Sequence, residues 1–204
     1  MFEPWIGKEY DSQKDFPKTL ILGESHYGNH HEGRYELSKK TIYCIDDQIQ
    51  WNNSYPFFTR LVSSLTGKKP NFEEKGEFWH KVAYHNLITE PLKGARRYPT
   101  VEQWEKSIET IPSVIEELKP KSCIVLGYRM WWRLHNRFDL EPCTSQYDAG
   151  PCGVVYSPSM NCYFHGMKHP SGRGFINAEW CSWIDNFIKE KWPNKSFQRT
   201  EYRR

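Results

Sequence analysis

The sequence lacks the features that mark several large classes of protein. No uncharged apolar run approaches the ~20 residues that a membrane-spanning helix requires. The first residues, Met1 to Lys8, have neither the basic start nor the apolar stretch of a signal peptide. Internal repeats and low-complexity tracts are also missing. We therefore expect an intracellular, cytoplasmic protein with no membrane partner.

Cysteine is present, but not in the spacing of a common metal centre. None of the six cysteines belongs to a C-x-x-C pair, the usual element of zinc and iron–sulfur sites. Disulfides are not expected in a reducing compartment, so Cys123 and Cys181 are interpreted as core residues. Four other residues are of types that bind metals, but they do not lie on a predicted helix, where an i, i+4 spacing would form a metal site: His26, His30, His31 and Glu32. The sequence thus predicts no metal and no other cofactor.

A strong excess of one charge is missing as well. The net charge of the 204 residues is +3, and hydrophobic residues make up only 38%, whereas aromatic residues reach 16%, too many for a disordered chain. Six of the basic residues and only two acidic ones fall between Lys189 and Arg204. The length suits one domain. We therefore expect a single domain over residues 1–204 with a short basic C-terminal tail.

Short apolar runs predict the strands. Thr19–Leu22 and Cys123–Leu126 are each followed by glycine, and such continuous runs are typical of parallel strands buried on both faces. Further candidates are 82–88, 153–156 and 162–165. Helical patterns lie at 36–49, 56–65, 100–118 with a bend at Pro112, 128–138, and from Asn177 onward. Alternating strands and helices predict an α/β fold with a mostly parallel sheet.

In such folds the chemistry lies at the carboxyl ends of the strands. Gly23-Glu24-Ser25-His26-Tyr27 follows the first predicted strand, and Asn86 follows the apolar start of the next candidate. Gly127 follows the strand at 123–126, and His169-Pro170-Ser171 follows the last one. The candidate site is therefore assembled from the segments that follow the strands.

These segments resemble those of the uracil-DNA glycosylase superfamily. There a G-Q-D-P-Y-H or G-E-A-P-G motif follows the first strand, an asparagine follows the second, and an H-P-S turn follows the last. The resemblance covers roughly residues 19–187. It implies a three-layer α/β/α fold with a central, mostly parallel four-stranded sheet, and a DNA glycosylase activity that flips out a modified or deaminated pyrimidine and hydrolyses its N-glycosidic bond.

Two departures from the first family motif affect the expected chemistry. Ser25 stands where the water-activating aspartate of G-Q-D-P-Y-H would be, and His26 replaces the proline. A carboxylate remains only at Glu24, as in the G-E-A-P-G branch. That branch often carries an iron–sulfur cluster, which the cysteine spacing here does not support.

The resemblance assigns roles residue by residue. His169 would donate a hydrogen bond to the departing base, Glu24 would orient or activate water, and Asn86 would bind the Watson–Crick edge. Phe57 or Phe58 would stack on the flipped base. The remaining substrate-binding candidates are Ser25, His26, Tyr27 and Ser171.

Basic residues near the strand ends imply DNA, single- or double-stranded, as the partner. The expected DNA contacts are Lys93, Arg96, Arg97, Lys168 and Arg173. Arg173 or Phe175 could also fill the stack that the flipped base leaves.

Structural interpretations of the same residues remain open. Asn86 suits a turn or a helix cap, Glu24 suits a loop anchor, and Lys93, Arg96 and Arg97 suit a solvated loop. A serine hydrolase is not favoured, because Tyr27 stands where the G-x-S-x-G motif requires glycine. Two functional alternatives also remain: excision of hypermodified phage bases as antiviral defence, and a non-catalytic nucleic-acid-binding module.

Overall fold

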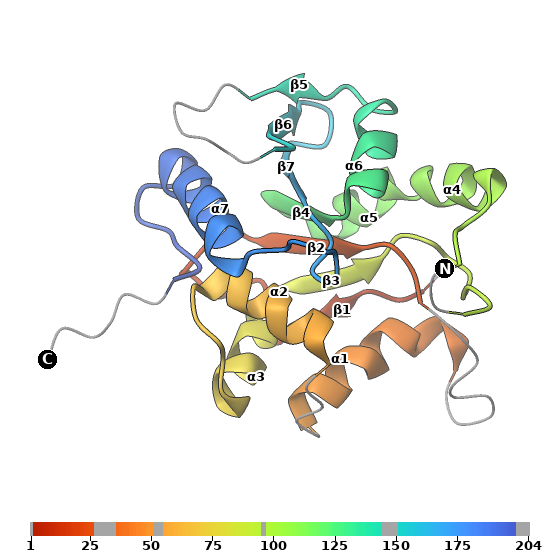
Figure 1. Ribbon diagram of the computed structural model, residues 1–204. Helices are drawn as coiled ribbons and strands as arrows, with labels where there is room; N and C mark the ends of the chain where they lie inside the picture. The colour runs from red at the N-terminus through yellow and green to blue at the C-terminus, as the bar shows by residue number, and fades with distance from the viewer. Residues whose placement is uncertain (1, 27–35, 51–54, 95–96, 144–150, 199–204) are drawn as a thin grey trace, which may run out of the picture.

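Seven strands of the described residues form one mixed sheet in the computed structural model of the protein (Figure 1). The structure describes residues 2–26, 36–50, 55–94, 97–143 and 151–198. The strand order is β1-β3-β2-β4-β7-β6-β5. The strands are β1 (Trp5–Ile6), β2 (Thr19–Gly23), β3 (Ala83–Asn86), β4 (Ser122–Leu126), β5 (Glu141–Pro142), β6 (Val154–Ser157) and β7 (Cys162–Met167).

The expected α/β class with a mostly parallel sheet is confirmed, but the expectation of four strands is wrong. β3, β2, β4 and β7 are parallel neighbours, and antiparallel strands extend this centre on both sides. The edge strands β1 and β5 have two residues each, too few to show a period in the sequence. β6 is antiparallel to β7 because only residues 158–161 connect them, whereas a parallel pair needs a long crossover.

Seven α-helices and one 3-10 helix accompany the sheet in the described part of the chain. They are η1 (Leu37–Lys39), α1 (Lys40–Gln50), α2 (Pro56–Thr66), α3 (Phe72–Lys81), α4 (Val101–Ile108), α5 (Ile111–Leu118), α6 (Tyr128–His135) and α7 (Asn177–Lys191). A complete capping box of Asn71 and Glu74 begins α3, which the apolar pattern of the sequence did not reveal.

Two predicted helix features differ from the structure. The single helix expected over 100–118 is two helices, because Pro112 lacks an N–H group and is accommodated only in the first turn of α5. The Thr100–Gln103 capping box at the start of α4 is confirmed. Asn177, expected as the cap of the last helix, is its first residue instead, and Ile176 occupies the cap position.

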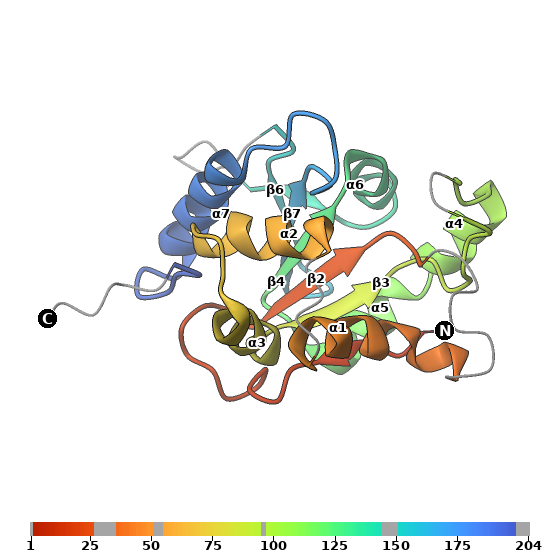
Figure 2. The ribbon, with the colours of Figure 1, turned by 60° about the horizontal axis from the view of Figure 1, so that its bottom comes forward.

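Helices cover both faces of the sheet (Figures 1 and 2). Apolar residues of α4, α5 and α6 pack with Leu20, Leu22 and Val125 on one face. Residues of α1, α2, α3 and α7 pack with Ile21 and Ile124 on the other. Successive strand residues thus enter opposite cores, which explains why the central strands are apolar without alternation.

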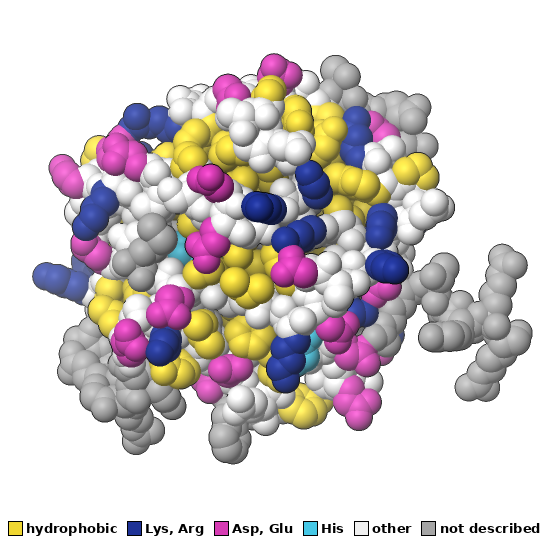
Figure 3. Space-filling model, turned by 180° about the vertical axis from the view of Figure 1, so that it is seen from behind, with side chains coloured by type: hydrophobic (Ala, Val, Ile, Leu, Met, Phe, Trp, Pro, Cys, Tyr) yellow, Lys and Arg dark blue, Asp and Glu magenta, His cyan; other side chains and the backbone are white. Residues whose placement is uncertain are grey.

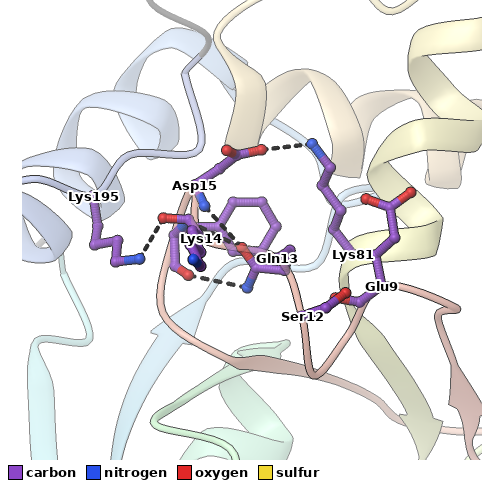
Figure 4. A network of polar contacts seen from close by, with 8 residues as sticks. Glu9, Ser12, Gln13, Lys14, Asp15, Lys81 and Lys195 are labelled. Carbon is purple, nitrogen blue, oxygen red and sulfur yellow. Dashed lines mark hydrogen bonds and ion pairs between the residues drawn. The ribbon is translucent and has the colours of Figure 1, made fainter.

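Part of the predicted basic tail is packed against the domain. Phe197 is buried and its ring stacks on Phe16 at a centroid distance of 4.2 Å. Lys195 donates a hydrogen bond to the carbonyl of Lys14, within a polar network that also joins Asp15 to Lys81 of α3 (Figure 4). The segment before β2, the end of α3 and the chain after α7 are therefore held together.

The molecule carries charges of both signs on the face seen from behind, where basic and acidic side chains are interspersed (Figure 3). No helix among the described residues has the length and apolarity needed to cross a membrane.

Candidate functional site

The carboxyl ends of the four parallel strands lie at one edge of the sheet. β2 ends at Gly23, β3 at Asn86, β4 at Leu126 and β7 at Met167. Residues that are far apart in the sequence therefore meet where the strands end. The candidate site consists of the segments that directly follow these four strands, together with Asn86 at the end of β3.

Asn86 is held by hydrogen bonds from two directions. Its amide Oδ1 accepts from the Tyr84 hydroxyl at 3.0 Å, and its Nδ2 lies 3.1 Å from His26 Nε2. The residue is 4% exposed. The orientation of the amide is therefore set by neighbours in the fold, so that its donor and acceptor sides are defined before any ligand binds.

Gly23 makes room for this arrangement. A Cβ atom at position 23 would lie 2.2 Å from Asn86 Oδ1 and 2.4 Å from the Tyr84 hydroxyl oxygen. Both contacts are far inside van der Waals distance. The glycine at the end of β2 is therefore required by the amide of Asn86 and the hydroxyl of Tyr84.

We expect Gly23→Ala to lower the free energy of unfolding by about 1–3 kcal/mol, because the new methyl group must displace the Asn86 amide. Denaturant unfolding measures this loss. Gly94→Ala is the matched control, since nothing lies within 4 Å of a Cβ there and its effect should stay within about 0.5 kcal/mol. Equal stability of the two variants would contradict the packing argument.

His26 is buried between α1 and the strand ends. Its Nε2 lies 2.8 Å from the Thr41 hydroxyl, and its ring meets Phe2 edge-on at a centroid distance of 4.9 Å. Burial, with a smaller effect of the Lys40 charge, lowers the pKa of His26 from 6.5 to about 3. The imidazole is thus neutral at pH 7, and its nearest partners are protein groups.

The buried His26 makes stability depend on pH. An unfolded chain binds a proton at this imidazole below about pH 6.5, while the folded chain does so only near pH 3. This group should lower the free energy of unfolding as the pH falls from 6.5 toward 3, by roughly 1 kcal/mol per pH unit, and contribute no pH dependence above that range. Denaturant unfolding at several pH values should give a shallower slope for His26→Gln. Identical slopes would show that His26 is not the source.

His169 lies in the turn after β7, where a backbone hydrogen bond fixes the tautomer of its neutral ring. The backbone N–H of Ser171 donates to His169 Nδ1 at 3.2 Å, so in the neutral ring the proton is on Nε2. Burial lowers the pKa of His169, with the Glu24 charge acting in the opposite direction and Arg129 in the same one. The site therefore presents a neutral imidazole with one N–H donor.

The turn after β7 is braced from several sides. The N–H of Gly172 donates to the His169 carbonyl at 2.7 Å, and Arg60 of α2 donates to the Pro170 carbonyl at 3.3 Å. Lys168 donates to the Gly174 carbonyl at 3.2 Å, which closes the loop. Ser171 and Arg173, expected to contact substrate and DNA, are exposed on this turn.

Glu24 is held by an arginine that the sequence analysis did not single out. Nε and Nη2 of Arg129 donate to the two carboxylate oxygens at 3.1 and 2.5 Å, and the Glu24 side chain is 10% exposed. This bidentate geometry fixes the plane of the carboxylate. The guanidinium also lies over the Tyr98 ring, 4.2 Å from its centroid.

A signal for Arg129 was present in the sequence. It follows Gly127, the residue after the third parallel strand, and the same rule that selected Glu24 and His169 applies to this position. The sequence did not predict that Arg129 pairs with Glu24, because the two residues are 105 positions apart.

The two phenylalanines of α2 have different neighbours. The Phe57 ring lies 5.1 Å from the His169 ring, centroid to centroid, at an angle of 35°. Phe58 faces inward and meets Trp79 and Tyr84 edge-on. Phe57 therefore belongs with His169, whereas Phe58 supports the tyrosine that orients Asn86.

The remaining predicted residues are less completely placed. The Ser25 hydroxyl is buried and has no hydrogen-bond partner among the described residues. Lys93 and Arg97 are exposed on the segment between β3 and α4, while Tyr27 and Arg96 lie outside the described residues. No group of three or more metal-ligating side chains occurs within the described ranges.

Searches against models of known protein families and against curated proteins find no match to this chain. The function is therefore inferred from the residues of the site.

Proposed function

We propose that the protein is a DNA glycosylase on a uracil-DNA glycosylase-like fold, which flips out a modified or deaminated pyrimidine and releases it by hydrolysis. The observation that carries the proposal is the neutral His169 with its proton on Nε2, beside the Phe57 ring and within the electrostatic reach of Glu24. An N–H donor next to an aromatic face suits a base that leaves as an anion.

Breaking the N-glycosidic bond leaves negative charge on the base and an oxocarbenium-like sugar. His169 Nε2–H would stabilise the charge on the base without giving up its proton. Phe57 would stack on the base, and the preset amide of Asn86 would read its hydrogen-bonding edge. Phe57 lies beside His169, Asn86 ends β3 at the same edge of the sheet, and the resemblance in motif order supports the same assignment.

Glu24 would hold the water that attacks the sugar carbon. Each carboxylate oxygen has lone pairs beyond the one that accepts from Arg129, so the carboxylate can bind a water molecule while it stays oriented. The same ion pair also suits a loop anchor in a non-catalytic DNA-binding protein. Variants of Glu24 distinguish these two roles.

The activity is tested by incubating the purified protein with oligonucleotides that carry uracil, other deaminated bases or hypermodified bases. Alkali then breaks the strand wherever a base has been released. We expect strand breaks at one class of base. No product with any member of the panel would exclude the glycosylase activity. Mass spectrometry of bases released from uracil-containing DNA and from modified phage DNA separates a repair enzyme from a defence enzyme.

A further inference from the structure

Helix α6 begins at the candidate site and exposes large aromatic side chains that the core does not use. Met130, Trp131 and Leu134 are buried against the sheet. Tyr128 is 36% exposed and Trp132 is 55% exposed. These two residues are four positions apart, so they lie on the same outer face about one turn, ~5.4 Å, from each other.

Arginines alternate with the aromatic residues on this side of the molecule. Arg129 lies over the Tyr98 ring, and Arg133 lies over Trp104 at 5.1 Å from the ring centroid. Tyr98 itself is 72% exposed. Arg129 is engaged with Glu24, but no carboxylate of the described residues forms an ion pair with Arg133. The surface formed by Tyr98, Tyr128, Trp132 and Arg133, here called the α6 surface, therefore has exposed aromatic rings and the positive charge of Arg133.

The α6 surface is continuous with the candidate site. Gly127, which precedes α6, donates its N–H to the Met167 carbonyl at the end of β7. A Cβ atom at Gly127 would lie 3.9 Å from His169 Cβ. A polymer with one unit held at His169 can thus extend along the exposed face of α6.

We propose that the α6 surface binds single-stranded DNA next to the target nucleotide. This inference rests on the proposed glycosylase function and adds the form of DNA that the protein prefers. Exposed rings bind nucleic acid by stacking on base faces, which are accessible in a single strand and covered by neighbouring bases in a duplex. Arg133 supplies the positive charge that a phosphate requires.

The test measures the binding of fluorescently labelled oligonucleotides that contain only ordinary bases, so that base release plays no part. By fluorescence anisotropy we expect tighter binding of the single strand than of the duplex of the same sequence. Trp132→Ala should weaken single-strand binding about 5- to 150-fold, the effect of losing one stacked base. The logarithm of the single-strand binding constant falls linearly with the logarithm of the salt concentration. Arg133→Gln should make this slope less negative by about 0.7, the contribution of one phosphate contact.

The matched control is Phe72→Ala on α3. Phe72 is 41% exposed, close to Trp132 in that respect, but lies on a helix of the opposite face of the sheet. Its loss should leave DNA affinity unchanged. Circular dichroism and thermal unfolding of each variant confirm that the substituted proteins are folded, as expected for exposed positions.

Several outcomes overturn the proposal. One is unchanged single-strand affinity in Trp132→Ala, and another is equal affinity of the wild type for duplex and single strand. A loss of self-association in Trp132→Ala by light scattering, with DNA affinity retained, assigns the surface to a second copy of the chain. If single-strand binding behaves as expected but no base is released from any substrate, the glycosylase proposal fails and the α6 surface stands.

Discussion

Replacing His169 with alanine should lower the single-turnover rate of base release about 10²–10³-fold, the usual effect of removing one preorganised donor to a developing anion. The structure explains why the donor is preorganised, since the Ser171 N–H occupies Nδ1 and leaves the proton on Nε2. His169→Gln keeps an amide N–H donor in this region and should retain more activity than the alanine variant. Quenched time points with excess enzyme measure the rate.

The control for this prediction is His80→Ala. His80 lies in the last turn of α3, shortly before β3 begins and so at the opposite end of the strand from Asn86. Its replacement should leave base release within about threefold of the wild-type rate, because it lies away from the carboxyl ends of the parallel strands. A His169→Ala protein that is folded, binds DNA and releases bases at the wild-type rate would refute the role of this histidine.

Glu24→Gln should lower base release about 10²–10⁴-fold if the carboxylate positions or activates water. The amide keeps the shape of the side chain and one acceptor oxygen, but it loses the negative charge. Arg129→Met should also slow the reaction, because the carboxylate then loses both hydrogen bonds that set its plane. DNA binding, measured separately, should survive Glu24→Gln in an enzyme and in a non-catalytic module alike.

A double-mutant cycle separates the structural role of the pair from its catalytic role. Unfolding of the wild type, the two single variants and Glu24→Gln/Arg129→Met should give a coupling free energy of about 0.5–3 kcal/mol, since the side chains are in direct contact. Coupling in stability together with unchanged base release in Glu24→Gln would identify Glu24 as a loop anchor. Coupling with a large loss of base release supports both roles.

The central strands could be predicted because their burial restricts which residues they contain. β2 and β4 are buried on both faces, which requires uninterrupted apolar residues, and the predicted runs at 19–22 and 123–126 match them. The edge strands and α3 were missed for the opposite reason. Two-residue strands have no period, and α3 buries too few apolar side chains to show one, although its cap residues Asn71 and Glu74 were visible.

The candidate site was predictable in its positions but not in its contacts. The rule that chemistry follows parallel strands selected Glu24, Asn86 and His169, and the structure places all three at one edge of the sheet. The rule did not indicate that Tyr84 and His26 hold Asn86 by hydrogen bonds. It also did not distinguish Phe57, which faces His169, from Phe58, which packs inward.

The sequence by itself determined the α/β class, the buried central strands β2 and β4, and the residues that follow the carboxyl ends of the predicted strands. These features follow from local composition, because burial on two faces and the need for a turn after each strand act on neighbouring residues. Only the tertiary structure decided the antiparallel extensions of the sheet, the pairing of Glu24 with Arg129 and the proton on His169 Nε2. Each of these depends on the distances and directions between groups brought together by folding, which sequence order alone does not specify.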